Sequence, residues 1–160
     1  MTRLKPYFKK SYLKWVVITL VVIFIGMQFI PLNRSNPPVT REVKWDSPQT
    51  KALAQRACND CHSNETTWPW DSYIAPSSFL IVSHVDEGRS RLNFSEWDKP
   101  NSDFEEVSRV VRNGEMPMWD YVLMHPTAKL TPAETQQLLD GLQATFQQDP
   151  PIARQRRTSR

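Results

Sequence analysis

Both cysteines of this chain stand in one short stretch, Cys58-Asn59-Asp60-Cys61-His62, which constrains the fold more than any other. Two thiols at this spacing can add to the two vinyl groups on one edge of a porphyrin, and the next residue then presents an imidazole to the iron. The spacing predicts one covalently attached haem c, with Cys58 and Cys61 as the thioether positions and His62 as the proximal iron ligand.

Two other uses of a Cys-x-x-Cys pair compete with haem attachment. A thioredoxin-like redox pair is expected in a βαβ setting, which this sequence does not indicate. A zinc site needs a second, closely spaced Cys/His pair, whereas His84 and His125 stand alone. Haem is therefore the working hypothesis, and a metal-free thiol protein is the reading that an absence of haem would favour.

The sign of the charge changes along the chain. Residues 1–30 carry five Lys/Arg and no acid, and residues 147–160 carry four Arg against one Asp. Residues 45–146 carry eight Lys/Arg and fifteen Asp/Glu, a net charge of −7. Because the folded part is acidic, the overall pI of about 9.0 does not indicate nucleic-acid binding, and we expect no nucleic-acid partner.

An uncharged run from Trp15 to Ile30 follows a basic stub, residues 1–12. The run can be extended to Leu13 if Lys14 snorkels, which predicts one transmembrane anchor over residues 13–30. No Ala-x-Ala cleavage site lies near its end, so an uncleaved anchor is favoured over a cleaved signal peptide.

The charges that flank this run predict its orientation. Five Lys/Arg precede it and only Arg34 follows closely, which places the N-terminus in the cytoplasm. The sequence therefore predicts a single-pass protein of the cytoplasmic (inner) membrane, with the haem domain in the periplasm or another extracytoplasmic space. The membrane is then a partner of residues 13–30.

The rest of the chain is predicted to form one domain between two irregular segments. Residues 31–46 contain three prolines and are expected to be an extended tether, and residues 147–160 a disordered basic tail. Thirteen prolines and four glycines argue against a regular sheet in the domain, residues 47–146. We expect an all-α, class I cytochrome c-like domain of about four helices around one haem.

Local signals predict where these helices begin and end. Start signals are Ser47 before Pro48, Ser77 or Ser78, the capping box of Ser102 with Glu105, and the capping box of Thr131 with Glu134. Gly88 and Gly114 are expected just after the second and third helices. The apolar stripes of the first and last helices predict that these two helices cross.

Met116 is the predicted distal iron ligand. It follows the helix stop at Gly114 and precedes Pro117, on a stiff loop, and its thioether favours reduced iron. The alternatives are Met118, His84, Met124 and His125. Arg89 and Arg91 are predicted partners for the haem propionates.

The motifs together resemble a class I c-type cytochrome and, more closely, the small bacterial haem-binding domain family, which is usually membrane-anchored or exported. The resemblance covers about residues 45–146 and is carried by Asp60-Cys-His-Ser-Asn-Glu-Thr-x-Trp-Pro-Trp, Ile74-Ala-Pro, His84-Val-x-Glu-Gly-Arg, Leu92-Asn-Phe-Ser-Glu-Trp, Gly114-Glu-Met-Pro and His125-Pro. It implies haem binding through Cys58, Cys61 and His62, and it does not settle the sixth iron ligand.

We expect a monohaem protein that transfers single electrons and makes or breaks no substrate bond, and therefore a carrier rather than an enzyme. The alternative is a haem enzyme or sensor, peroxidase-like or gas-binding, with an open distal position. The sequence does not identify the redox partner protein.

Overall fold

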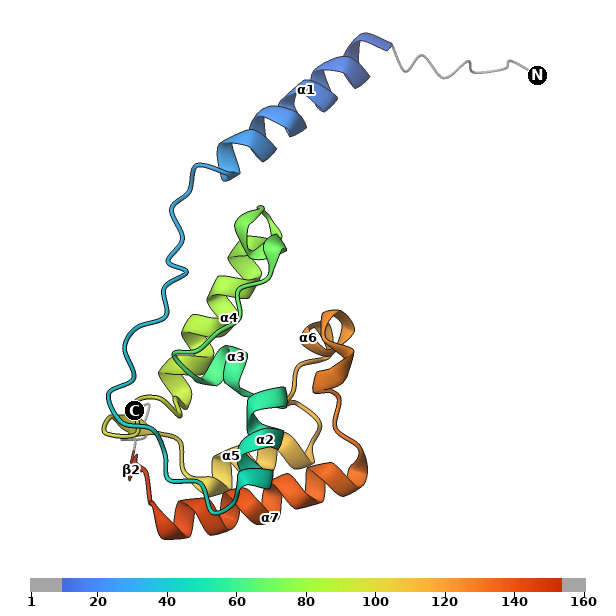
Figure 1. Ribbon diagram of the computed structural model, residues 1–160. Helices are drawn as coiled ribbons and strands as arrows, with labels where there is room; N and C mark the ends of the chain where they lie inside the picture. Colours follow the sequence, from blue (N-terminus) through green and yellow to red (C-terminus); the bar gives the residue numbers. More distant parts are fainter. Residues whose placement is uncertain (1–9, 154–160) are drawn as a thin grey trace, which may run out of the picture. The chain divides into compact units, whose positions relative to one another are not determined.

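The computed structural model describes residues 10–153, which are mostly helical. In chain order the elements are α1 (Lys10–Met27), α2 (Pro48–Ala57), α3 (Asn59–His62), η1 (Trp70–Tyr73), α4 (Ser77–Arg91), β1 (Pro100–Asn101), α5 (Phe104–Arg112), α6 (Trp119–Met124), η2 (Pro126–Ala128), α7 (Pro132–Gln148) and β2 (Ile152–Ala153) (Figure 1). They form two compact units, one with residues 10–33 and 69–82 and the other with residues 34–68 and 83–153.

The membrane anchor predicted over residues 13–30 is wrong. Helix α1 ends at Met27 and residues 28–30 form turns, so the end of the predicted span is not helical.

Among residues 10–153, no helix is long and apolar enough to cross a membrane. The predicted fold class is corrected accordingly: residues 10–153 form a mostly helical fold in which no helix meets the requirements of a membrane span. The membrane partner, the inner-membrane location and the N-in orientation were all derived from the anchor, and they lose their basis with it.

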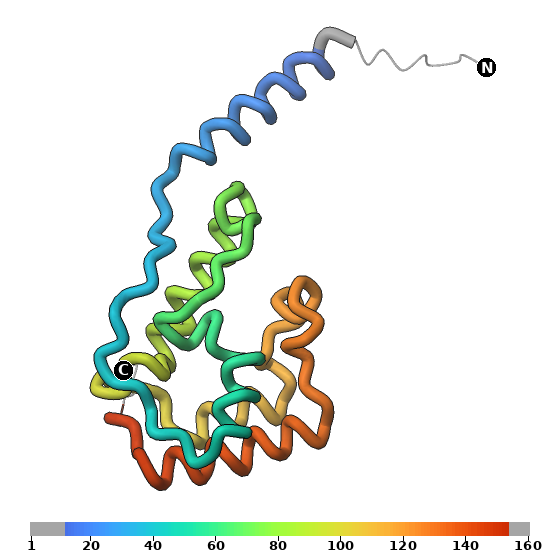
Figure 2. The backbone as a smooth tube through the Cα atoms, in the orientation of Figure 1, coloured from blue at the N-terminus to red at the C-terminus, as the bar shows by residue number. Residues whose placement is uncertain are grey.

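The second unit is built around three helices, α2, α5 and α7, of which α7 packs on both of the others (Figure 2). The predicted starts of α2 and α7 are confirmed. The Ser47 hydroxyl accepts a hydrogen bond from the Thr50 amide, and Pro48 is the first helical residue of α2. Thr131 forms a complete capping box with Glu134. These side chains satisfy amide groups that the first helical turn leaves without partners.

The crossing of the first and last helices of this unit is also confirmed. A Cβ added at Gly141 of α7 would lie 1.9 Å from Oγ1 of Thr50 on α2. The α7 backbone therefore lies so close to the Thr50 side chain that a larger residue at position 141 would force Thr50 or one of the helices to shift.

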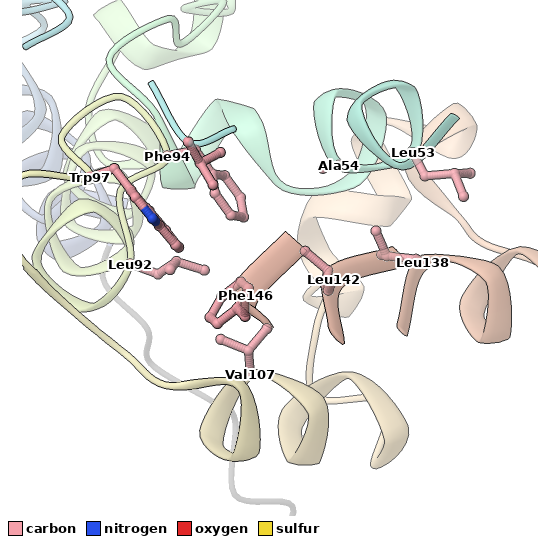
Figure 3. Close-up of a cluster of buried hydrophobic side chains, with 10 residues drawn as sticks. Leu53, Ala54, Leu92, Phe94, Trp97, Val107, Leu138, Leu142 and Phe146 are labelled. Carbon is pink, nitrogen blue, oxygen red and sulfur yellow. The ribbon is translucent and has the colours of Figure 1, made fainter. Parts of the chain in front are cut away.

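The core of this unit lies between α7, α2 and the irregular segment after α4. Leu138, Leu142 and Phe146 project from α7 toward the other core side chains (Figure 3). Trp97 is fully buried, and its indole Nε1 donates to the Asp149 carbonyl at 2.9 Å. The ring of Trp97 meets that of Phe146 edge-on, with centroids 5.2 Å apart.

Both ends of the second unit are more ordered than the sequence indicated. Residue Val43, in the predicted tether, is buried and its amide donates to the Phe94 carbonyl at 3.0 Å. In the predicted disordered tail, residues 147–148 continue α7, and β2 pairs in parallel with β1. Residues 154–160 lie outside the described part.

Two helix boundaries differ from the prediction, and one helix is additional. Helix α4 continues through Gly88 to Arg91. Helix α5 is capped by Asp103, whose carboxylate accepts from the Glu106 amide at 2.9 Å, while the Ser102 hydroxyl donates to the Arg91 carbonyl at 3.1 Å. Helix α6 was not predicted.

Candidate functional site

The Cys-x-x-Cys-His stretch lies where α2 gives way to α3. Cys58 ends α2 with a non-helical backbone and also precedes α3, which carries Cys61 and His62. The Cys58 carbonyl accepts from the amides of Cys61 and His62, at 3.1 and 2.9 Å. One turn of backbone thus holds both thiols and the imidazole in a fixed relation.

Helix α4 packs directly against this turn at Gly88. A Cβ at position 88 would lie 2.4 Å from the Cys61 carbonyl oxygen. Gly88 is therefore required by a close approach of two backbones inside the helix, and not by a helix end as the sequence suggested.

The end of α4 and the residue after it hold the imidazole of His62 in place. Its Nδ1 lies 3.1 Å from the Gly88 carbonyl and 3.0 Å from the Leu92 carbonyl. Because carbonyl oxygens only accept, Nδ1 carries the proton, and the lone pair of Nε2 is left for another partner. Burial lowers the pKa of His62 against the opposing effect of the two carbonyls, so the ring stays neutral.

A cavity of about 360 Å³ opens beside the motif. Its walls are mainly apolar, and four of its lining residues, Leu92, Phe94, Val107 and Leu142, also belong to the hydrophobic core. The lining groups that carry sulfur or ring nitrogen come from α2, α3, α4 and the segment after α5: Cys58, Cys61, His62, His84, Met116 and Met118.

The segment after α5 is set by Gly114. Its φ of 71° is a left-handed conformation that favours glycine, as the predicted helix stop requires. The Val110 carbonyl then accepts from the amides of Glu115 and Met116, at 2.9 and 3.2 Å. Met116 and Met118 both follow this turn and both line the cavity.

The family model for the haem-binding domain matches residues 22–144 of this chain. The chain belongs to the haem-binding domain family. The match begins well before residue 45, where the sequence motifs placed the start of the resemblance. No curated protein matches the chain, and no solved structure matches it either.

The residues of the cavity fit the cofactor that the family binds. Haem needs an apolar slot with a nitrogen or sulfur ligand for its iron, and the cavity offers a neutral imidazole and two thioethers. Both thiols of the chain line the same slot. The haem-binding domain therefore has its donor set in one place.

The surroundings of the two thiols differ from those of a reactive dithiol. Burial raises the pKa of Cys58 to about 12. Burial, with the charges of Asp60 and Asp120, raises that of Cys61 to about 11. Reactive dithiols have lowered values, and in the described part of the chain no group of three His, Cys, Asp or Glu residues could hold a metal ion.

The other candidate ligands fall into two groups. His84 lines the cavity, with its Nδ1 3.9 Å from an Asp120 carboxylate oxygen. Met124 is exposed, and His125 stacks on Tyr121 with ring centroids 4.3 Å apart. Neither Met124 nor His125 is among the residues that line the cavity.

The two arginines that were predicted to pair with the haem propionates lie in different surroundings. Arg91 lines the cavity and pairs with Glu87 at 3.5 Å. Arg89 does not line it; its guanidinium donates to the carbonyls of Ser63 and Ser35 at 2.8 and 2.9 Å. Arg89 thus joins the loop after the motif to residue 35.

The lining residues that sequence reasoning missed include Tyr121 and Arg109. Tyr121 lies on the unpredicted helix α6, and its hydroxyl donates to the Asp60 carboxylate at 2.7 Å. Arg109 lies on the exposed side of α5 beside Glu115. Local periodicity carries no signal for either, because both reach the cavity through the tertiary fold.

Proposed function

We propose that Cys58 and Cys61 hold one haem covalently, as haem c, and that the domain transfers single electrons. In attachment each thiol S–H adds across a vinyl C=C bond, so a C–S bond forms, the proton goes to the other carbon, and no oxidant is needed. The observation that carries the proposal is the fixed imidazole of His62 beside two thiols on one cavity wall.

The arrangement of His62 supports its role as proximal ligand. Iron-ligating histidines commonly donate the other ring N–H to a backbone carbonyl or a carboxylate, which fixes the tautomer and the ring orientation. Here two carbonyls, of Gly88 and Leu92, accept from Nδ1. Nε2 is therefore the nitrogen available to iron.

Met116 is the proposed distal ligand, and its place after Gly114 supports this. The turn at Gly114 directs the chain out of α5, and the Met116 amide is tied to the Val110 carbonyl at 3.2 Å. Met118 lines the same cavity and precedes α6 as its N-cap residue. Variants must decide between the two sulfurs.

Electron transfer is favoured because the cavity offers ligation and shielding. The bound haem would supply Fe(III)/Fe(II) cycling. The chain would exclude water from it with core side chains such as Leu92 and Phe94, which line the cavity. Arg91, also in the lining, is the proposed propionate partner, since its guanidinium is matched to carboxylates.

Haem attachment is tested by expressing the full chain with a c-type maturation system. The chain is denatured on a gel and stained for the peroxidase activity of covalent haem. We expect a stained band for the wild type and for Glu65→Gln, a control at an exposed residue close to the motif. The Cys58→Ala/Cys61→Ala variant should give none, and a band that survives in it would overturn the proposal.

The electron-transfer role is tested by an optical redox titration of the purified protein. A reversible one-electron transition of a six-coordinate, low-spin iron supports it. The alternative, a haem enzyme or sensor with an open distal position, predicts high-spin iron and rapid binding of carbon monoxide by the reduced wild type.

A further inference from the structure

Tyr121 connects the two sides of the haem cavity. It lies on α6, directly after the segment with Met116 and Met118, and it lines the cavity. Its hydroxyl donates to Oδ2 of Asp60 at 2.7 Å. Asp60 is one of the two residues between the cysteines, so this hydrogen bond ties the distal segment to the attachment motif itself.

The carboxylate of Asp60 is held in place from its other side. Its Oδ1 accepts from the Thr67 amide at 2.9 Å, and its backbone carbonyl accepts from the Thr66 hydroxyl at 2.7 Å. The Thr66 hydroxyl in turn accepts from Arg89 at 2.8 Å. The Asp60 carboxylate is thus held in place by contacts other than the one with Tyr121.

Tyr121 is positioned as a donor on its own side as well. Its ring stacks on His125 at 4.3 Å and 19°, and Nδ1 of His125 lies 3.2 Å from the Tyr121 carbonyl. Burial and the Asp60 carboxylate both raise the pKa of the phenol, so it keeps its proton.

We propose that the hydrogen bond from Tyr121 to Asp60 is a latch that holds residues 115–125 over the haem and thereby keeps small ligands from the iron. The inference rests on the proposed function. It makes Tyr121 a positioning residue, because its hydroxyl acts on distal access through the segment that carries the candidate thioethers. Loss of this hydrogen bond should leave haem attachment intact and increase the fraction of molecules in which the distal side is open.

The test compares carbon monoxide binding to the reduced full chain in the wild type and in Tyr121→Phe. The variant keeps the ring that lines the cavity and removes only the donor. A hydrogen bond to a charged acceptor is worth a factor of about 10–100 in an equilibrium. We therefore expect binding to become about 10–100 times faster. Tyr73→Phe, at an exposed residue, is the matched control and should bind as the wild type does.

A double-mutant cycle with Asp60→Ala tests the pair itself. If the hydrogen bond is the latch, the double variant should bind carbon monoxide no faster than the faster single variant. Additive effects of the two substitutions, or equal binding by wild type and Tyr121→Phe, would overturn the inference. Thermal unfolding of each variant separates a general loss of stability from a local opening.

The two proposals fail in different ways. A wild type without covalent haem on the denaturing gel contradicts the proposed function and removes the latch with it. A wild type with covalent haem, whose carbon monoxide binding does not respond to Tyr121→Phe, contradicts the latch alone.

Discussion

The two sides of the haem cavity are built in different ways. On the proximal side, backbone meets backbone: α4 approaches Cys61 so closely at position 88 that a Cβ would lie 2.4 Å away, and the carbonyls of Gly88 in α4 and of Leu92 just after it accept from His62. On the distal side, residues 115–125 are half-buried or exposed, and Trp119 is 79% exposed. There the Tyr121 side chain makes the contact with the motif.

The comparison indicates which side of the cavity is rigid before haem binds. The proposed proximal ligand, His62, is oriented by main-chain carbonyls of α4 and of the residue after it, which interior packing keeps rigid. The distal segment depends on a side-chain hydrogen bond and a short helix, so its position is easier to change. Substitutions should therefore affect the two sides differently.

The largest effect is expected from His62→Ala. The variant removes the proposed proximal ligand and leaves two carbonyls without their donor, so the six-coordinate low-spin spectrum should be lost completely. Visible absorption and electron paramagnetic resonance of the oxidised protein measure this. Met124→Ala, which changes an exposed side chain outside the cavity lining, is the control and should keep the spectrum. A low-spin spectrum that survives in His62→Ala and disappears in His84→Ala would contradict the assignment.

Gly88→Ala should be the most damaging conservative change on the proximal side. The added methyl would meet the Cys61 carbonyl oxygen at 2.4 Å, and overpacking of this kind costs about 1–3 kcal/mol. We expect a lower free energy of unfolding in urea and less attached haem.

Gly26→Ala is the control for that change. It adds the same methyl to α1 at a position with nothing within 4 Å, and alanine is the better helix former. Equal effects of the two substitutions on haem attachment would contradict the role given to Gly88.

On the distal side, Met116→Ala should remove one ligand and spare the attachment. The long-wavelength sulfur-to-iron absorption of the oxidised protein should disappear and the reduction potential should fall, since a thioether favours reduced iron. Met118→Ala should leave both nearly unchanged. If only Met118→Ala removes the absorption, the other sulfur is the ligand, and if neither does, His84 is the next candidate.

The smallest effects are expected from the arginines. Arg91→Gln removes a positive charge from the cavity lining. Because reduction lowers the charge of the iron, losing that cation should lower the potential slightly. Arg89→Gln should leave the potential unchanged and lower the free energy of unfolding by about 1–3 kcal/mol, through lost hydrogen bonds to Ser63 and Thr66. If Arg89→Gln lowers the potential and Arg91→Gln does not, Arg89 is the propionate partner.

Local chemistry was predictable from the sequence wherever neighbours in the chain decide it. Proline after Ser47 and Thr131 marked two helix starts, and Gly114 marked a stop, because caps and φ preferences act within a few residues. Gly88 was misread as a helix end, since its real reason is the backbone of Cys61. Such an approach leaves no local signature.

The same distinction between local signals and tertiary contacts applies to the site. The motif that carries Cys58, Cys61 and His62 is local, and the structure places all three on one cavity. The bond between Asp60 and Tyr121 joins residues 61 positions apart, so no spacing rule finds it. The anchor failed because an uncharged run does not show where its helix ends, and here α1 ends at Met27.

The central claim is that this cavity holds one haem through Cys58 and Cys61. The most direct measurement is the intact mass of the acid-denatured full chain, after matured protein has been extracted with an organic solvent that removes free haem. The account predicts the mass of the chain plus one haem, and the chain mass alone for Cys58→Ala/Cys61→Ala. A wild type that has the mass of the bare chain, with all haem in the extract, would contradict it.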